Sequence, residues 1–289
     1  MSVALDPDEI GAKIIDGKEL ARSVRREIRR QVKRLKFTPG LAVVQVGDDP
    51  ASTVYVSNKE KDCKYVGFHS EVHRMPAETS QAAVIEQIHT LNSREDIHGI
   101  IAQMPVPDSI DGDAIINTIV PEKDADGLTL VNLGNLLINR EQIVPCTPAG
   151  IIRLIESTGV EIEGSHTVCV GRSSLVGKPV GLMLLNRNST VTYCHTRTRE
   201  LASETQRADI LIAAAGRPKL ITADMIKPGV LVIDVGITIA EGGFVGDVDY
   251  ESVKEVAGFI TPVPGGVGPM TRAMLLENTL ELALAQKEK

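Results

Sequence analysis

Hydrophobic and polar positions along this chain follow two patterns, continuous apolar runs and apolar residues at helical spacing. Runs such as residues 210–215 and 230–233 are typical of parallel strands buried on both faces. Helical or irregular stretches separate them. We therefore expect an α/β protein with right-handed crossovers between strands and with ligand bound at the carboxyl ends of the strands.

The second half of the chain predicts a Rossmann-like parallel sheet. Its first strand-like segment runs into Gly171, and a helical stretch follows at residues 180–185. Pro179 suits the first helical position, because its φ is fixed and it needs no N–H partner there. A strand, a glycine turn and a helix N-terminus form a phosphate-binding arrangement, although the residues depart from G-x-G-x-x-G. The expected strands are residues 167–170, 190–194, 209–214, 230–235 and 259–260.

The first half repeats the alternation less regularly. Together the halves predict two α/β lobes with a cleft between them. We expect residues 1–148 and a C-terminal helix at 271–289 to form one domain, and residues 149–270 to form the other. The elements expected in the first half are helices at 22–33, 50–66, 81–91 and 148–159 and strands at 41–46, 70–74 and 99–103.

The composition favours a soluble enzyme, with 43% hydrophobic and 24% charged residues among 289. A net charge of −7 gives no support to nonspecific nucleic-acid binding. Arginines at 22–33 allow a basic patch for RNA, but a solvated helix face explains them better.

No apolar run has membrane-spanning length and the N-terminus lacks a secretion signal, so we expect a cytoplasmic protein without membrane contact. The four cysteines have no metal or redox spacing and predict reduced thiols.

Three polar features stand out in the first lobe. Tyr55 and Lys59 are four residues apart and share a helix face. Gln103 ends an apolar strand, so it should point into the cleft at the carboxyl edge of the sheet. Asp126 lies in an acidic turn ahead of the next helix. Each also has an ordinary explanation, because such helix pairs are usually surface residues and Asp before Gly is usually a turn.

A fourth feature is the segment at residues 261–271, in which Gly and Pro predominate and no residue is charged. We expect it to lack regular structure and to lie at the ligand-binding edge, after the last strand. Prolines stiffen such a loop, and glycines let a flat ligand approach the backbone closely. A simple connector is the alternative.

The second strand of the Rossmann-like lobe indicates the dinucleotide. NAD sites usually end this strand with an acidic residue for the ribose hydroxyls. Here residues 195–199 contain no acid, which first appears at Glu200. Arg172, together with a basic side chain or a hydroxyl group in this loop, suits the extra phosphate of NADP. NADP is therefore favoured over NAD as the cofactor. An exposed basic loop remains the alternative.

Several strings of residues, in order and nearly end to end, resemble the bifunctional methylenetetrahydrofolate dehydrogenase/methenyltetrahydrofolate cyclohydrolase family. The chain departs from the family's usual residues at apolar positions such as Met104 and Ala125, where only the apolar side chain changes. At Thr196 the family commonly has serine, and threonine keeps the hydroxyl group. The matching strings are residues 55–63, 99–107, 121–127, 145–148, 171–173, 194–196, 234–237, 246–248 and 261–271.

The resemblance implies a soluble homodimeric enzyme of one-carbon metabolism, serving purine, methionine and histidine biosynthesis. A tetrahydrofolate with a one-carbon bridge binds in the cleft, hydride passes from the bridge to NADP, and water then opens the methenyl ring to give formyltetrahydrofolate. Residues 1–148 with 271–289 are then the folate-binding catalytic domain, and 149–270 the NADP-binding domain. No metal is implied.

The resemblance also implies residue roles. Lys59 is the key residue of the water step and interacts with Gln103, while Tyr55 stacks on or orients the folate and Asp126 holds polar edges of the pterin. These four form the catalytic set. The implied substrate-binding residues are Tyr55, Val56, Ser57, Asn58, Lys59, Ala102, Gln103, Met104, Asp126, Pro264, Gly265, Gly266, Val267 and Gly268, and the cofactor-binding residues are Gly171, Arg172, Ser173, Thr196 and Ile237.

Two other hypotheses remain at this point. A shikimate-dehydrogenase-like oxidoreductase also pairs a substrate lobe that carries Lys and Asp with an NADP lobe. A nucleotide-sensing module without turnover is the alternative outside enzymes. The intact set of Lys59, Gln103 and Asp126 argues against the sensing module.

Overall fold

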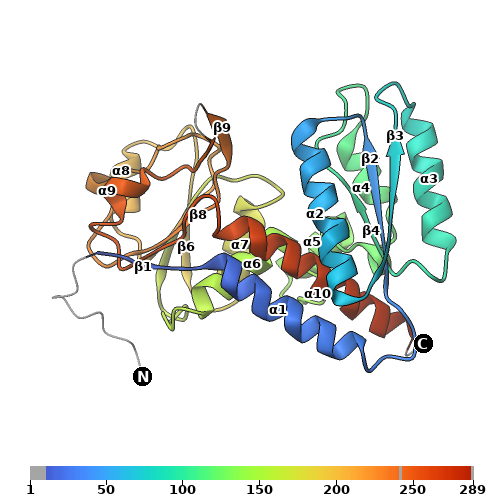
Figure 1. Cartoon of the computed structure of the whole chain (residues 1–289). Helices are drawn as coiled ribbons and strands as arrows, with labels where there is room; N and C mark the ends of the chain where they lie inside the picture. Colours follow the sequence, from blue (N-terminus) through green and yellow to red (C-terminus); the bar gives the residue numbers. More distant parts are fainter. Residues whose placement is uncertain (1–10, 241–242, 288–289) are drawn as a thin grey trace. The chain divides into compact units, whose positions relative to one another are not determined.

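The computed structural model describes residues 11–240 and 243–287, which fall into two compact units (Figure 1). The six-stranded unit comprises residues 11–21 and 147–271, and the three-stranded unit comprises residues 22–146 and 272–287. The chain passes from one unit to the other within α1 (Gly17–Val32), at the start of α6 (Cys146–Glu156) and within α10 (Val267–Lys287).

The six-stranded unit is built on a parallel sheet, which confirms the predicted Rossmann-like fold class. Its strand order is β1-β11-β8-β7-β5-β6, and every neighbouring pair is parallel. The chain leaves β5 for β6 on one side and later returns to β7 on the other, so a topological switch point lies between β5 and β7. The strands are β1 (Lys13–Ile14), β5 (His166–Val170), β6 (Thr190–Cys194), β7 (Ile210–Ala213), β8 (Leu231–Asp234) and β11 (Phe259–Ile260).

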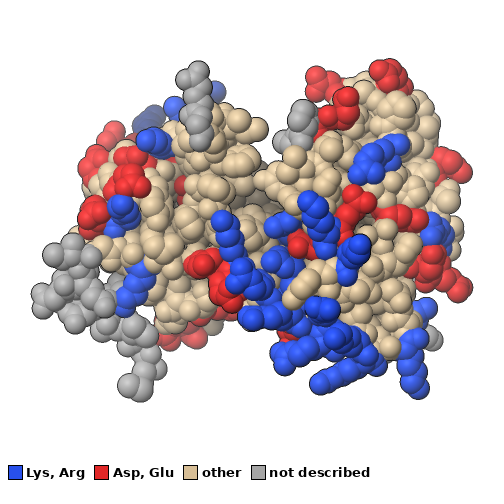
Figure 2. Space-filling view, viewed as in Figure 1, with Lys and Arg blue, Asp and Glu red and all other residues tan. Residues whose placement is uncertain are grey.

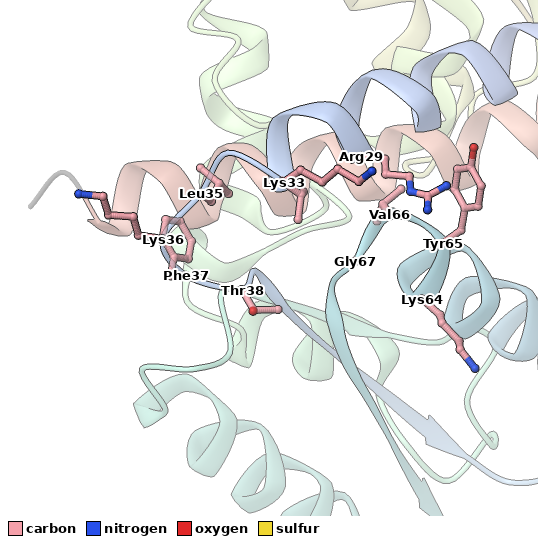
Figure 3. Close-up of a pocket in the computed structure, with 11 residues that line it drawn as sticks. Arg29, Lys33, Leu35, Lys36, Phe37, Thr38, Lys64, Tyr65, Val66 and Gly67 are labelled. Carbon is pink, nitrogen blue, oxygen red and sulfur yellow. The ribbon is translucent and has the colours of Figure 1, made fainter.

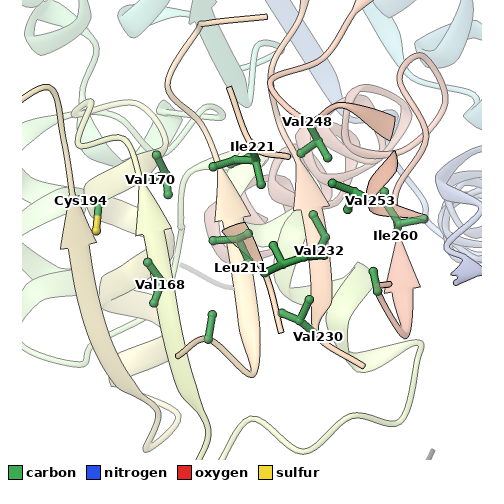
Figure 4. Close-up of a cluster of buried hydrophobic side chains, with 14 residues drawn as sticks. Val168, Val170, Cys194, Leu211, Ile221, Val230, Val232, Val248, Val253 and Ile260 are labelled. Atoms are coloured by element: carbon green, nitrogen blue, oxygen red, sulfur yellow. The ribbon is translucent and has the colours of Figure 1, made fainter. Parts of the chain in front are cut away.

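Apolar side chains from successive strands form the core on one face of this sheet (Figure 4). Val168 and Val170 lie two residues apart on β5 and therefore share that face with Leu211 and Val232. Strands β7 and β8 are buried along their whole length, as their continuous apolar sequences predict. The smaller elements of the unit are α7 (Gly177–Leu185), α8 (Leu201–Thr205), η2 (Ala223–Met225), α9 (Tyr250–Val253) and an antiparallel ribbon of β9 (Thr238–Ala240) and β10 (Gly243–Val245).

The three-stranded unit has a parallel sheet in the order β3-β2-β4, with β2 (Gly40–Val46) buried throughout between β3 (His69–Met75) and β4 (Gly99–Ala102). A parallel bridge from Ile100 to Asp124 extends this sheet beyond β4. The helices are α2 (Pro50–Val66), α3 (Gln81–Ser93), α4 (Gly112–Thr118) and α5 (Leu130–Leu137), with η1 at Pro121–Lys123.

Side-chain caps fix where the two crossover helices begin. The Asp49 carboxylate accepts a hydrogen bond from the Ser52 N–H at 2.7 Å, and the Ser80 hydroxyl accepts one from the Ala83 N–H at 3.3 Å. Each bond satisfies one of the N–H groups that the first helical turn leaves without an intrahelical partner. The caps therefore set the register in which α2 and α3 present their residues.

The N-terminal segment corrects the predicted domain division. Residues 11–21 belong with residues 147–271 rather than with the first half, because β1 pairs in parallel with β11, Lys13 opposite Phe259. A two-residue strand has too little pattern for the sequence to predict its partner. Residues 1–10, where the predicted domain starts, lie outside the described residues.

Two helix starts also differ from expectation. Helix α10 begins at Val267, so residues 267–271 are helical although the Gly/Pro-rich sequence predicted irregular structure to 271. Pro269 stands in the first turn, where no intrahelical partner for its nitrogen is needed. Helix α7 begins at Gly177, which makes Pro179 its third residue rather than its first.

All four cysteines are buried and free. Within residues 11–240 and 243–287, no helix is both long enough and apolar enough to cross a bilayer.

Candidate functional site

Lys59 and Gln103 meet at the carboxyl edge of the three-stranded sheet. Gln103 directly follows β4, and its N–H donates to the Val44 carbonyl of β2 at 2.8 Å. Lys59 Nζ, on α2, donates to Gln103 Oε1 at 2.9 Å, while Gln103 Nε2 donates to the Met104 carbonyl at 2.7 Å. Because its amide nitrogen is held by Met104, Gln103 presents its oxygen to the lysine.

Asp126 follows the segment that bridges to β4. The Ala125 N–H donates to the Ile100 carbonyl at 3.2 Å, so Asp126 comes to the same edge as Gln103. The Asp124 carboxylate shapes the turn, accepting from the N–H groups of Gly127 at 2.9 Å and Thr129 at 2.7 Å. The sequence prediction of an acidic turn before a helix thus describes the observed backbone.

The electrostatics of this edge couple Asp126 to Lys59. The residue keeps some solvent exposure, but protein surrounds its carboxyl, and burial raises the pKa of Asp126. The ammonium of Lys59 acts in the opposite direction, and the charge of Asp124 adds to the rise in the pKa. Lys59 is therefore within electrostatic reach of Asp126 as well as bonded to Gln103.

The remaining predicted residues of this unit lie on the same two elements. Tyr55 is one turn before Lys59 on α2 and is partly buried, and it has no described contact with Gln103 or Asp126. The residues between them are Val56, which is fully buried in the core, and the partly buried Ser57 and Asn58. Ala102 ends β4, and Met104 follows Gln103 with a cis bond to Pro105.

In the six-stranded unit, Gly171 lies at the switch point. Its N–H donates to the Cys194 carbonyl of β6 at 2.9 Å, and its φ is +125°. A Cβ at this position would lie 2.0 Å from the Ala214 carbonyl oxygen, so only glycine lets the turn after β5 pass this close to the end of β7. In doubly wound sheets a dinucleotide binds at such a switch point.

Arg172, Ser173 and Thr196 surround this turn and are exposed. β5 and β6 are paired in register from His166 to Val170, which sets the loop with Thr196 beside the turn with Arg172. The Ser173 hydroxyl accepts from the N–H groups of Val176 at 3.1 Å and Gly177 at 3.2 Å, so it holds the backbone that leads into α7. Ser173 therefore has a structural role that the sequence did not indicate.

The remaining predicted residues of this unit follow its last strands. Ile237, 45% exposed, follows β8, and Pro264 and Gly265 form the turn between β11 and α10. Gly266 and Val267 are buried. A Cβ at Gly268 would lie 4.0 Å from Ile237 Cδ1, so this turn comes close to the residue predicted to contact the cofactor.

Sequence reasoning missed a pair of buried aspartates at this edge. The Asp234 carboxylate accepts from the N–H groups of Gly236, Asp247 and Val248 at 2.9–3.0 Å. The Asp247 carboxylate in turn accepts from Ala215 at 2.6 Å and Gly216 at 2.8 Å. The two side chains therefore tie together the loops after β7 and β8 and the end of the β9–β10 ribbon. The sequence placed Asp234 at the end of an expected strand and indicated no structural role for either aspartate.

Cations gather on α1 and the end of α2 (Figure 2), beside a pocket of about 500 Å³. The Arg29 guanidinium lies over the Tyr65 ring, 5.0 Å from its centroid, and Lys33 points toward Arg29, whereas Lys36 and Lys64 point away in different directions (Figure 3). Both helices end here, where cations offset the negative end of the helix dipole. Because the cations diverge, a solvated basic face explains them better than an anion site.

Two family models match this chain. The tetrahydrofolate dehydrogenase/cyclohydrolase catalytic domain matches residues 15–126, and the NAD(P)-binding domain of the same family matches residues 145–287. The chain belongs to the tetrahydrofolate dehydrogenase/cyclohydrolase family. Lys59, Gln103 and Asp126 lie within the part matched by the family's catalytic domain, and Gly171 lies within the part matched by its NAD(P)-binding domain.

Relatives of this family are similar over nearly the whole chain. The bifunctional protein FolD of Moorella thermoacetica is 56% identical over 276 residues, 94% of this chain and 99% of the relative. The structure of the bifunctional FolD of Campylobacter jejuni is 43% identical with a TM-score of 0.93, over 95% of this chain and 99% of that one. The methylenetetrahydrofolate dehydrogenase-cyclohydrolase of Trypanosoma brucei, complexed with NADP cofactor and inhibitor, is 38% identical with a TM-score of 0.92, over 96% and 99%.

The shikimate dehydrogenase hypothesis receives only a likeness of fold. The Thermus thermophilus shikimate dehydrogenase is 12% identical, with a TM-score of 0.52 over 86% of this chain and 99% of that one. Membership of the tetrahydrofolate dehydrogenase/cyclohydrolase family, with relatives near half identity, disfavours it.

Replacing Gly171 with alanine should destabilise the six-stranded unit by about 2 kcal/mol or more, because the new Cβ meets the Ala214 carbonyl and strains the backbone. Urea unfolding measures the loss. Gly164→Ala is the matched control, since Gly164 also has a positive φ but a Cβ added there has no atom within 4 Å. Equal losses in the two variants would show that the close approach to Ala214 has no energetic weight.

Asp234 should make stability depend on pH. Burial raises the pKa of this carboxyl from its ordinary 3.8 to about 7, even though three N–H groups bond to it. The folded state then binds more protons than the unfolded state between these values, so the contribution of Asp234 to stability falls as pH rises from about 4 to 7. Urea unfolding at pH 5, 6, 7 and 8 should give a flatter profile for Asp234→Asn than for the wild type, and parallel profiles would refute the assignment.

Proposed function

We propose that this chain is a bifunctional enzyme that oxidises methylenetetrahydrofolate to methenyltetrahydrofolate with NADP and then hydrolyses the product to formyltetrahydrofolate. The observation that carries the proposal is the hydrogen bond between Lys59 and Gln103, 2.9 Å long, with Asp126 at the same sheet edge. This cluster lies in the part matched by the family's catalytic domain. Relatives of 50–56% identity are named bifunctional.

The residues of the six-stranded unit fit a dinucleotide with an extra phosphate. Gly171 lies at the switch point, and a Cβ at Gly216 would meet no atom within 4 Å, which leaves room beside the loop after β7. Arg172 is exposed at this turn, and the first acid after β6 is Glu200. A ribose phosphate would be met by a guanidinium rather than by a carboxylate. Gly171, Arg172, Ser173, Thr196 and Ile237 are the residues that we assign to NADP.

The oxidation step requires mainly positioning. NADP, when bound, accepts the hydride that leaves the methylene bridge, and the bridge becomes a methenyl cation. The chain supplies surfaces that hold the flat ligand in place, and Tyr55, one turn before Lys59, is suited to stack on its rings. We also assign Pro264, Gly265, Gly266, Val267 and Gly268 to folate binding, since backbone without bulky side chains permits close approach.

The hydrolysis step requires proton transfer. Water adds to the methenyl carbon and loses a proton, and one carbon–nitrogen bond then breaks as its nitrogen takes a proton up. Lys59 holds protons at Nζ, and its bond to Gln103 Oε1 occupies only one of them and fixes the direction of the side chain. We assign proton transfer in this step to Lys59 and orientation of Lys59 to Gln103.

Asp126 is assigned to the pterin. A carboxyl can accept hydrogen bonds from the ring N–H and amino groups of a pterin, and a partly desolvated carboxyl forms stronger bonds than one in water. The neighbouring segments, Val56, Ser57 and Asn58 on α2 and Ala102 and Met104 around Gln103, complete the wall on which the substrate rests.

We also propose that the enzyme is a cytoplasmic homodimer of one-carbon metabolism that serves purine, methionine and histidine biosynthesis, without nucleic-acid partners. The β9–β10 ribbon supports the dimer, because Ile239 is 71% exposed and Phe244 is 49% exposed, an apolar surface suited to a second copy.

Lys59→Ala should abolish hydrolysis of methenyltetrahydrofolate, with a loss of about a hundredfold or more, because the proton-transfer group is gone. The loss of methenyl absorbance measures this step directly, and NADPH formation from methylenetetrahydrofolate tests the oxidation. Lys61→Ala, an exposed lysine on the same helix, is the control and should keep the wild-type rate. Hydrolysis at the wild-type rate in Lys59→Ala would overturn the assigned role, and a wild-type protein inactive on both substrates would overturn the function.

Arg172→Ala should lower kcat/KM for NADP by roughly tenfold or more and leave the value for NAD nearly unchanged, because only NADP carries the phosphate that a guanidinium would bind. Initial rates with methylenetetrahydrofolate and each dinucleotide give both values. Arg207→Ala, an exposed arginine of the same unit that pairs with Glu204, serves as the control. Equal losses with NADP and NAD would place the extra phosphate elsewhere.

A further inference from the structure

The turn that carries Asp126 is held by a side chain from α10. Asn278 Nδ2 donates to the Ala125 carbonyl at 3.0 Å and to the Val144 carbonyl at 2.9 Å. Asn278 is only 5% exposed, so these bonds form away from water. One amide nitrogen has two protons, and here each is directed to the backbone on a different side of the Asp126 turn.

The residue before Asp126 is bonded at both of its ends. Ala125 donates its N–H to β4, and its carbonyl accepts from the Cys146 thiol at 3.3 Å as well as from Asn278. The Cys146 N–H also donates to the Asp126 carbonyl at 3.3 Å. Burial raises the pKa of the Cys146 thiol well above its ordinary value, so the thiol stays protonated and remains a donor.

Close packing couples the Asp126 turn to the backbone at Val144. Gly127 has φ of +71°, and a Cβ there would lie 2.5 Å from the Val144 carbonyl carbon. The Asp126 turn therefore rests directly on the backbone whose carbonyl Asn278 holds. A shift of Val144 would displace the turn and the carboxyl with it.

We propose that Asn278 is a positioning residue for Asp126 and thereby for the folate. By bonding the carbonyls of Ala125 and Val144 together, it fixes the carboxyl of Asp126 relative to Gln103 and Lys59. The inference rests on the proposed role of Asp126 in pterin binding. It makes α10 part of the substrate site through a residue that touches no substrate atom.

The neighbouring residue on α10 supplies a matched control. Thr279 is fully buried, and its hydroxyl donates to the Leu275 carbonyl of its own helix at 2.7 Å. Thr279→Val keeps the shape and removes a buried hydrogen bond within α10 rather than one to the backbone of the Asp126 turn. Asn278→Ala and Thr279→Val should therefore both lower thermal stability, but only Asn278→Ala should affect the site.

The test is a double-mutant cycle on the full-length enzyme with methylenetetrahydrofolate and NADP. Asn278→Ala should raise the KM for the folate by about tenfold, with the KM for NADP within about twofold of wild type, because a displaced carboxyl costs binding at one substrate only. Thr279→Val should leave both KM values unchanged. In an Asp126→Asn background, adding Asn278→Ala should cause less than about a threefold further change in kcat/KM, since its target is gone.

Two results would overturn the inference. One is a folate KM for Asn278→Ala that is no higher than the folate KM for Thr279→Val. The other is a loss of kcat/KM on adding Asn278→Ala that is as large in the Asp126→Asn background as in the wild type. Wild-type activity, measured first, separates failure of this inference from failure of the proposed function. If Asn278→Ala does not yield folded protein, Asn278→Ser keeps one side-chain donor in place of two, and it should raise the folate KM only when Asp126 is intact.

Discussion

Parallel pairing of strands is the constraint on which both candidate sites depend. In each sheet the chain leaves a central strand for a neighbour on one side and returns on the other, from β5 to β6 and β7, and from β2 to β3 and β4. The loops at the carboxyl ends of the central strand and of the strand on the return side must then diverge, and an opening forms between them. Gly171 follows one central strand, and Gln103 follows the strand added on the return side in the other sheet. Topology therefore places the polar residues before any side chain makes a bond.

Hydrogen bonds then fix the orientation of the polar side chains that the topology has placed. Gln103 has a fixed amide because Met104 takes its nitrogen, and Lys59 has a fixed direction because Gln103 offers its oxygen. Asp126 is fixed through the backbone of the preceding residue, because the Ala125 N–H bonds to Ile100 and the Ala125 carbonyl to Asn278. The site is thus held by bonds that do not involve a substrate, as preorganisation requires.

The sequence was sufficient for the elements with strong local signals. The short buried runs of β7 and β8 predicted strands because of their length and flanking residues, and the spacing of Tyr55 and Lys59 predicted a shared helix face. The position of Gln103 at the end of an apolar run predicted the sheet edge, and its hydrogen bond to Lys59 agrees with the interaction that the family resemblance implied. The roles assigned to these residues stay predictions that the kinetic variants test.

The features that could not be predicted depend on contacts between distant residues. β1 is too short for a pattern, so only its pairing with β11 assigns residues 11–21 to their unit. In the sequence, Asn278 is an ordinary polar residue of a helix. Its role depends on hydrogen bonds to carbonyl groups 134 and 153 positions earlier in the chain. The sequence likewise gives no sign of the three N–H groups that bond to Asp234 and the two that bond to Asp247.

Charge on this molecule is informative where it is buried and ambiguous where it is exposed. Lysines and arginines gather on α1 and the end of α2, yet Lys36 and Lys64 point away from Arg29, and solvent and the helix dipoles already account for such exposed cations. A carboxylate removed from water needs compensating partners, because its burial costs free energy. Asp124, Asp234 and Asp247 find them in backbone N–H groups, so folding alone explains these three. Among the described residues no backbone N–H bonds to the Asp126 carboxyl, which lies beside Lys59 instead, and this leaves it available to the pterin proposed above.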